Sequence, residues 1–122
     1  MCAGCKTVDG NTFCRAMVNV RDSLKYPPHY YFSMILKVVG PPLSFGEAGN
    51  IQQMADHSGY TNVEFTPEVI DSFKTIKEGK IYKLRYVQSG DNGIIVDKNT
   101  KIVECTSTET IEKYSDVQKY CE

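Results

Sequence analysis

The sequence has no long hydrophobic run and no excess of charge of either sign. Its longest apolar stretch covers residues 34–36 and resumes after Lys37 at residues 38–39, whereas a membrane-spanning helix needs about 18 to 20 apolar residues. We therefore expect no membrane span. The 14 Lys and Arg residues nearly balance the 15 Asp and Glu residues, and the basic residues are scattered along the chain. Because a polyanion requires a clustered basic surface, we expect no nucleic-acid partner.

Histidine is scarce, and the motifs that could carry catalysis are incomplete. His29 follows a proline and His57 precedes Ser-Gly, so both are expected in loops. Nothing predicts that they converge into a hydrolytic triad or a zinc site. Cys2 and Cys5 have C-x-x-C spacing, but a redox dithiol needs a preceding strand and a zinc site needs a second such pair. Residues 90–93 fit a hairpin turn better than a phosphate loop. We expect no enzyme activity, no cofactor and no bound metal.

Cysteine is absent from residues 15–104, because all the cysteines lie toward the two ends of the chain. They are Cys2, Cys5, Cys14, Cys105 and Cys121. Such a pattern indicates disulfides that tie the termini together in an oxidising compartment, while five reduced thiols in a cytosolic protein remain an alternative. No apolar signal segment follows Met1. We expect a secreted, extracellular protein whose signal has been removed and whose Met1 was added for expression.

The pattern of turns and alternating side chains predicts a mainly β fold. Runs rich in β-branched and aromatic residues predict strands at residues 16–24, 30–39, 61–65, 80–88, 94–96 and 101–105. Helical patterns are predicted at residues 11–14, at residues 67–73 with Thr66 as cap, and at residues 107–120. Residues 48–55 could form a helical turn or a short strand. Five or six short strands with helices at both ends predict a Greek-key barrel of the OB type, in a single domain over residues 1–122.

A tyrosine-rich stretch is the clearest candidate for a binding loop. Tyr26, His29, Tyr30 and Tyr31 lie close together around two prolines, and Tyr offers a large contact area at low entropy cost. The alternative is that Tyr30 or Tyr31 enters the core where a strand begins. Residues 40–60 form a second candidate binding segment.

Both ends of the chain resemble a known module. Cys2 and Cys5 open the chain, residues 12–21 read Thr-Phe-Cys-Arg-Ala-Met-Val-Asn-Val-Arg, and Cys105 is followed by a segment that ends Tyr-Cys-Glu at residues 120–122. This order resembles the netrin-like module, and most of all the N-terminal domain of the tissue inhibitors of metalloproteinases. The resemblance covers residues 2–21 and 101–122. It implies an OB-type barrel flanked by N- and C-terminal helices.

The resemblance also implies a disulfide framework and a set of contact residues. By position, Cys5 would pair with Cys105 and Cys14 with Cys121, which leaves Cys2 unpaired. In the family, the α-amine and carbonyl of the first Cys chelate the zinc of a protease, and the next side chain enters its specificity pocket.

In this chain the zinc-protease contact would fall to Cys2 and Ala3, followed by Gly4 and Cys5, provided that Met1 is removed. The family spacing is C-x-C, so the C-x-x-C here lengthens the contact segment by one residue. We therefore predict a secreted, monomeric, non-enzymatic netrin-like protein that binds another extracellular protein, with a host protein as one candidate, and that does not inhibit metalloproteinases effectively. Inhibition of a zinc metalloproteinase through the Cys2 segment is the alternative.

Overall fold

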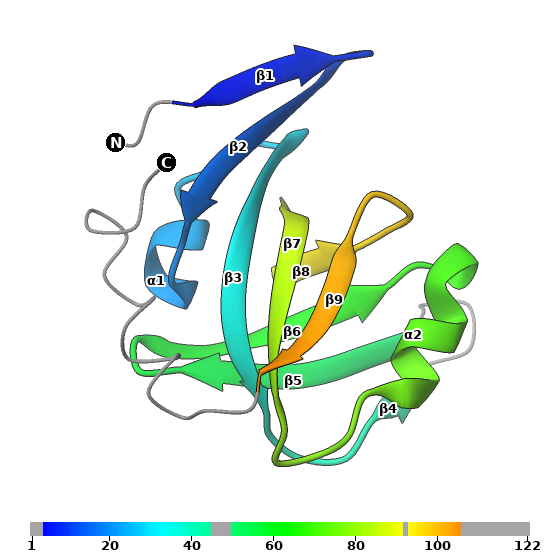
Figure 1. Ribbon diagram of the computed structural model, residues 1–122. Coiled ribbons are helices and arrows are strands. Elements are labelled where there is room, and N and C mark those ends of the chain that lie inside the picture. The colour runs from blue at the N-terminus through cyan, green and yellow to red at the C-terminus, as the bar shows by residue number, and fades with distance from the viewer. Residues whose placement is uncertain (1–3, 45–49, 92, 106–122) are drawn as a thin grey trace.

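A closed barrel of five strands forms the centre of the computed structural model, which describes residues 4–44, 50–91 and 93–105 (Figure 1). Around the barrel the strands are β3 (Tyr30–Val38), β5 (Asn50–Asp56), β6 (Gly59–Phe65), β8 (Gly93–Val96) and β7 (Ile81–Gly90). Strand β3 pairs with β7 to close the ring, and β6 and β8 are the one parallel pair within it. This is the topology of an OB-type barrel, so the predicted fold class is confirmed.

Further elements extend the barrel at its rims. β1 (Cys5–Val8) and β2 (Asn11–Met17) form an N-terminal hairpin, in which β2 runs parallel to β3. β9 (Lys101–Cys105) pairs with β7, and the short β4 (Leu43–Ser44) pairs with β5. The helices are α1 (Val20–Ser23), the 3₁₀ helix η2 (Pro67–Val69) and α2 (Ile70–Thr75). Among the described residues no helix is both long and apolar enough to cross a membrane.

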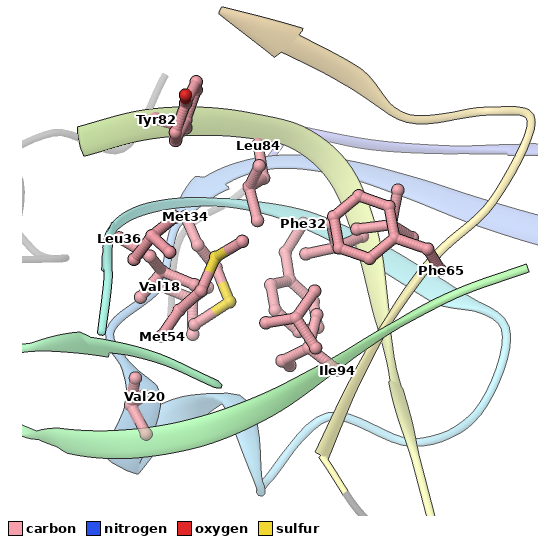
Figure 2. Close-up of a cluster of buried hydrophobic side chains, with 14 of the residues drawn as sticks. Val18, Val20, Phe32, Met34, Leu36, Met54, Phe65, Tyr82, Leu84 and Ile94 are labelled. Carbon is pink, nitrogen blue, oxygen red and sulfur yellow. The ribbon is translucent and has the colours of Figure 1, made fainter. Parts of the chain in front are cut away.

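The core fills the barrel because side chains alternate between its two faces. In β3, Phe32, Met34 and Leu36 are fully buried, as the period-2 alternation of a strand requires. Figure 2 shows these side chains meeting Met54 of β5 and Leu84 of β7 inside the barrel. This apolar cluster makes the barrel a rigid support for the side chains on its outer face.

The N-terminal region differs from its prediction at two places. Residues 11–14, predicted as a helix, belong to β2, because Asp9 and Gly10 both take positive φ angles (50° and 83°) and turn the chain into a hairpin. An Asp-Gly pair is a strong hairpin signal. The strand predicted over residues 16–24 is also wrong beyond Met17. There the Asn19 side chain accepts a hydrogen bond from the Asp22 N–H (2.8 Å) and starts α1.

The other predicted elements agree with the structure where it describes them. Strands are confirmed within residues 30–39, 61–65, 80–88, 94–96 and 101–105, and residues 50–55 of the ambiguous segment belong to β5. The helical segment predicted over residues 67–73 is present as η2 and α2. Thr66 takes the N-cap position, but its buried hydroxyl makes no hydrogen bond with the described residues. The helix predicted over residues 107–120 lies outside the described residues.

Candidate functional site

The disulfide pairing differs from the one that the family resemblance implied. Cys5 and Cys14 face each other across the β1–β2 hairpin and are bonded to each other, so the predicted bridges to Cys105 and Cys121 are both wrong. The hairpin turn brings the two Cα atoms to 4.0 Å, whereas Cys105 lies at the end of β9 opposite Ile81. Cys105 is a free, partly buried thiol, and burial raises its pKa. The disulfide between Cys5 and Cys14 therefore closes a short local loop.

The predicted protease-contact segment is only partly described. Cys2 and Ala3 lie outside the described residues. Gly4 and Cys5 lie at the start of the hairpin and line a hollow of about 540 Å³, whose opposite wall is Tyr86 of β7. The structure thus places half of the predicted segment beside an open hollow.

The tyrosine-rich stretch does not form one exposed surface. Tyr26 packs against Phe32 of the core, with ring centroids 4.7 Å apart. Tyr31 is 3% exposed, so it follows the alternative in which a tyrosine enters the protein at the start of a strand. Only His29 and Tyr30 remain exposed, at the turn into β3.

Tyr31 belongs to a buried polar cluster with a structural role. Its hydroxyl donates to Oδ2 of Asp97 (2.6 Å) and accepts from Nε2 of Gln88 (3.0 Å) and Nδ2 of Asn99 (3.3 Å). Burial raises the Tyr31 pKa, and the hydrogen bond to Asp97 raises it further. The cluster ties β3 and β7 to the turn that follows β8, and it satisfies a carboxylate that would be costly to bury alone.

The outer face of β5 and β6 is a second surface that could hold a ligand. Outward-facing side chains are paired across the two strands: Ile51 with Glu64, Gln53 with Asn62, and Ala55 with Tyr60. We name this surface, together with Leu24 and Asp91 at its border, the β5–β6 face.

Two hollows lie on the β5–β6 face and share part of their lining. The larger, of about 370 Å³, includes Leu24, Gln53 and Tyr60. The smaller, of about 180 Å³, includes Ile51 and Glu64. Both are lined by Asn62, Gly90, Asp91 and Gly93. The face is therefore a continuous depression that runs from α1 to the β7–β8 turn.

The β5–β6 face combines exposed apolar side chains with carboxylates. Leu24 and Tyr60, 75% and 71% exposed, are the most exposed of the large hydrophobic side chains in the described part of the chain. Glu64 and Asp91 supply two carboxylates, and none of the described residues that line the two hollows is Lys or Arg. A partner on this face would therefore meet apolar and acidic groups together.

A network around Asp56 positions the Leu24 wall. Oδ2 of Asp56 accepts a hydrogen bond from the Val20 N–H at the start of α1 (3.0 Å), and Oδ1 accepts from the N–H and hydroxyl of Ser58 (2.8 and 2.6 Å). The Ser58 hydroxyl in turn accepts from the Arg21 N–H (3.2 Å). The β5–β6 turn thus holds α1, and Leu24 at its C-cap, beside β6.

Gly93 shapes the floor of the depression. Its φ of +148° and its contact with the Asn62 backbone leave no room for a Cβ atom, because the added atom would collide with the Asn62 carbonyl oxygen. Only glycine allows β8 to approach β6 this closely.

The sequence indicated part of the β5–β6 face. Ile51, Gln53 and Tyr60 fall within the candidate segment 40–60, and residues 90–93 were predicted as a turn. Leu24 and Asn62 were missed, because only barrel closure brings them together. Within the described ranges, no group of three or more His, Cys, Asp or Glu residues could hold a metal ion.

Comparison with known proteins supports the fold. No family model and no curated protein matches the chain. Among solved structures, the OB domain of MM0293 from Methanosarcina mazei is similar with a TM-score of 0.61 and 16% identity, over 75% of this chain and 85% of that one. The OB domain of Ta0387 from Thermoplasma acidophilum has a TM-score of 0.49 and 16% identity, over 75% of this chain and 89% of that one. The Ifi202 HINa domain, solved with double-stranded DNA, has a TM-score of 0.49 and 14% identity, over 67% of this chain and 48% of that one. At these identities the likeness shows the OB fold alone.

Proposed function

We propose that this protein is a non-enzymatic binding module that recognises another protein through the β5–β6 face. The observation that carries the proposal is the placement of Leu24 and Tyr60, the most exposed large hydrophobic side chains described, in one hollow. Exposed apolar and aromatic groups gathered in a depression are typical of protein interfaces. The face also lies on the second and third strands of the barrel, where OB folds bind their ligands.

Electrostatics favours a protein over a nucleic acid as the ligand of this face. A nucleic-acid groove needs Lys or Arg to neutralise phosphates, whereas the acidic or basic side chains lining the two hollows of the β5–β6 face are Glu64 and Asp91. These carboxylates would repel a phosphate backbone. They fit a partner surface that carries apolar side chains and a basic rim.

We propose that the protein is extracellular and that it is a netrin-like module. The Cys5–Cys14 disulfide supports this setting, because stable disulfides persist in oxidising compartments. The motifs at the two ends of the chain support the module type, and the OB barrel is compatible with it.

Site-specific photo-crosslinking tests the proposed face. Benzoylphenylalanine replaces Tyr60 in one variant and Val103 in the control, which is 49% exposed on β9. Both are applied to cell surfaces and conditioned medium. We expect a discrete protein adduct from position 60 only, competed by excess unlabelled protein but not by the Leu24→Glu variant. Equal adducts from both positions, or competition by oligo(dT), would contradict the proposal.

Inhibition of a zinc metalloproteinase is the second candidate. It is favoured by the disulfide at Cys5, which anchors the end of the predicted contact segment to β2. Protein beginning at Cys2 would be compared with protein that retains Met1, against a panel of zinc metalloproteinases. Inhibition by the first form only would establish this mechanism, since Met1 ties up the Cys2 nitrogen in a peptide bond that cannot chelate zinc. Lack of inhibition by both forms would eliminate it and leave the β5–β6 proposal intact.

A further inference from the structure

We propose that the free edge of β1 takes up an extended, acidic segment of a partner protein as an additional β-strand. This surface shares no lining residue with the β5–β6 face, so the inference does not rest on the function proposed above. Main-chain hydrogen bonds would supply affinity, and the hollow beside the hairpin would select the side chains.

The first observation is the open edge itself. Within residues 4–44, 50–91 and 93–105, strand β1 begins the sheet order and pairs only with β2, and all four of its residues are exposed. In Figure 1 the β1–β2 hairpin projects beyond the barrel, with β1 on its outer side. An exposed edge of this kind is a template for a further strand unless something blocks it.

The register shows which amide groups the edge offers. The Arg15 N–H donates to the Gly4 carbonyl (3.4 Å), which makes these two residues a hydrogen-bonded pair. Hydrogen-bonded pairs alternate with non-hydrogen-bonded ones along an antiparallel ladder. In the observed register Cys5 and Thr7 fall in the non-hydrogen-bonded pairs. Their N–H and C=O groups therefore point away from β2, toward an added strand.

The second observation is the hollow of about 540 Å³ beside this edge. Gly4, Lys6 and Val8 line it from the β1 side, and Phe13 and Arg15 line it from β2, with Tyr86 opposite. Lys6 and Phe13 are cross-strand partners, so their side chains share the face that looks into the hollow. A side chain of an added strand would enter the same space.

The aromatic wall of the hollow is held in place before any ligand binds. Tyr86 takes a positive φ of 68° at a bulge of β7, and its ring meets Phe13 edge-on at 5.2 Å. Phe13 stacks on Tyr31 at 4.8 Å, and the Tyr31 hydroxyl is fixed by Asp97. A non-glycine residue in this conformation is costly and persists where the surroundings enforce it.

Charge selects the chemistry of the partner. Lys6 and Arg15 are exposed and line the hollow, and no Asp or Glu is among its described lining residues. No ion pair involves either cation within the described part of the chain. A second copy of the chain would place the same cations against each other, so an acidic segment of a different protein fits better.

Peptide binding to the intact protein tests the proposal. The probes are acetyl-Glu-Val-Glu-Val-Glu-Val-amide and its Lys-Val counterpart, each with a fluorescent label and measured by anisotropy. We expect the acidic peptide to bind and to slow amide hydrogen exchange at Cys5 and Thr7. Equal binding of both peptides, or protection confined to β9 or the β5–β6 face, would overturn the proposal.

Variants separate edge pairing from nonspecific charge attraction. Thr7→Pro removes an outward-facing N–H and the side-chain hydrogen bond between the Thr7 and Thr12 hydroxyls (3.0 Å), but no backbone hydrogen bond of the hairpin. We expect it to weaken acidic-peptide binding at least tenfold. Lys6→Glu with Arg15→Glu should do the same. If thermal melting shows that Thr7→Pro does not fold, this double variant alone tests the proposal. The matched control, Lys98→Glu with Lys101→Glu, makes the same charge change at other exposed positions and should retain binding. Equal losses in the control, or a concentration-dependent dimer that Thr7→Pro abolishes, would refute an acidic partner strand.

Discussion

At the scale of single residues, the Tyr31 cluster shows how a side chain that looks suited to binding can be structural. Its hydroxyl meets Asp97, Gln88 and Asn99 inside the protein. Nothing local separates Tyr31 from its neighbour Tyr30, because both begin the same aromatic strand. Packing decides between them: Phe13 of β2 stacks on the Tyr31 ring and covers it, whereas Tyr30, the first residue of β3, is left exposed.

Removing the Tyr31 hydroxyl should destabilise the protein measurably. Tyr31→Phe leaves Asp97, 8% exposed, without its shortest hydrogen bond, and such a loss costs about 1 to 3 kcal/mol. Urea unfolding would measure this change. Tyr30→Phe is the matched control, because Tyr30 is 39% exposed, and it should change the unfolding free energy little. Equal effects of the two variants would show that the cluster contributes nothing.

The same cluster predicts how stability responds to alkaline pH. Burial and the hydrogen bond to Asp97 raise the pKa of Tyr31, and burial together with Asp22 raises that of Tyr26, above the ordinary 10.0. A raised tyrosine pKa favours the neutral form in the folded state. Its stabilising contribution is thus complete below pH 10.0 and is lost as pH rises through the folded-state pKa. Melting curves from pH 8 to 11 should show this decline, and Tyr31→Phe should flatten it. An identical decline in the variant would exclude Tyr31 as a cause.

At the scale of elements, the β1–β2 hairpin is held by a disulfide that spans nine positions of sequence. In the chain-entropy model, closing so short a loop lowers the entropy of the unfolded chain, which stabilises the folded state by about 2 to 3 kcal/mol. Because β2 is the one strand that β1 pairs with among the described residues, this effect should remain local.

The double variant Cys5→Ala, Cys14→Ala should therefore open the hairpin and spare the barrel. We expect amide hydrogen exchange to become faster in β1 and in the first half of β2, while β3 and β7 keep their protection. Hydrogen exchange read by NMR would resolve the strands. Loss of protection throughout the barrel would show that the bridge supports the whole fold.

At the scale of the whole molecule, barrel closure depends on the parallel approach of β8 to β6. Gly93 makes this approach possible, since a Cβ would collide with the backbone of Asn62. The same closure brings the β7–β8 turn against the β5–β6 face. The shape of the candidate site and the integrity of the barrel therefore both depend on Gly93.

Gly93→Ala should accordingly cost more than an alanine at another glycine with positive φ. Gly79, at φ +85°, has no atom within 4 Å of a built Cβ, so Gly79→Ala should cost only conformational strain of about 1 to 2 kcal/mol. Gly93→Ala adds a steric collision, for which overpacking typically adds about 1 to 3 kcal/mol. Chemical denaturation of the two variants would compare them. A smaller loss for Gly93→Ala would mean that β8 shifts freely.

The sequence by itself determined the strands and the fold class. Alternation and turn residues are local properties, so residues 30–39, 80–88 and 101–105 could be assigned to strands without knowledge of their neighbours. Short strands separated by such turns lead to a barrel, because closure pairs their edges. Where local signals competed, as in the Asp9-Gly10 turn and the Asn19 cap, the prediction failed.

Only the tertiary structure decided which distant residues meet. Cys14 bonds to Cys5 because the hairpin register places them opposite each other, a fact that cysteine spacing alone does not contain. Leu24 and Tyr60 share a hollow because Asp56 holds α1 on the β5–β6 turn. Such contacts depend on pairing between strands far apart in the chain, whereas a sequence pattern reports only the side-chain periodicity within each strand.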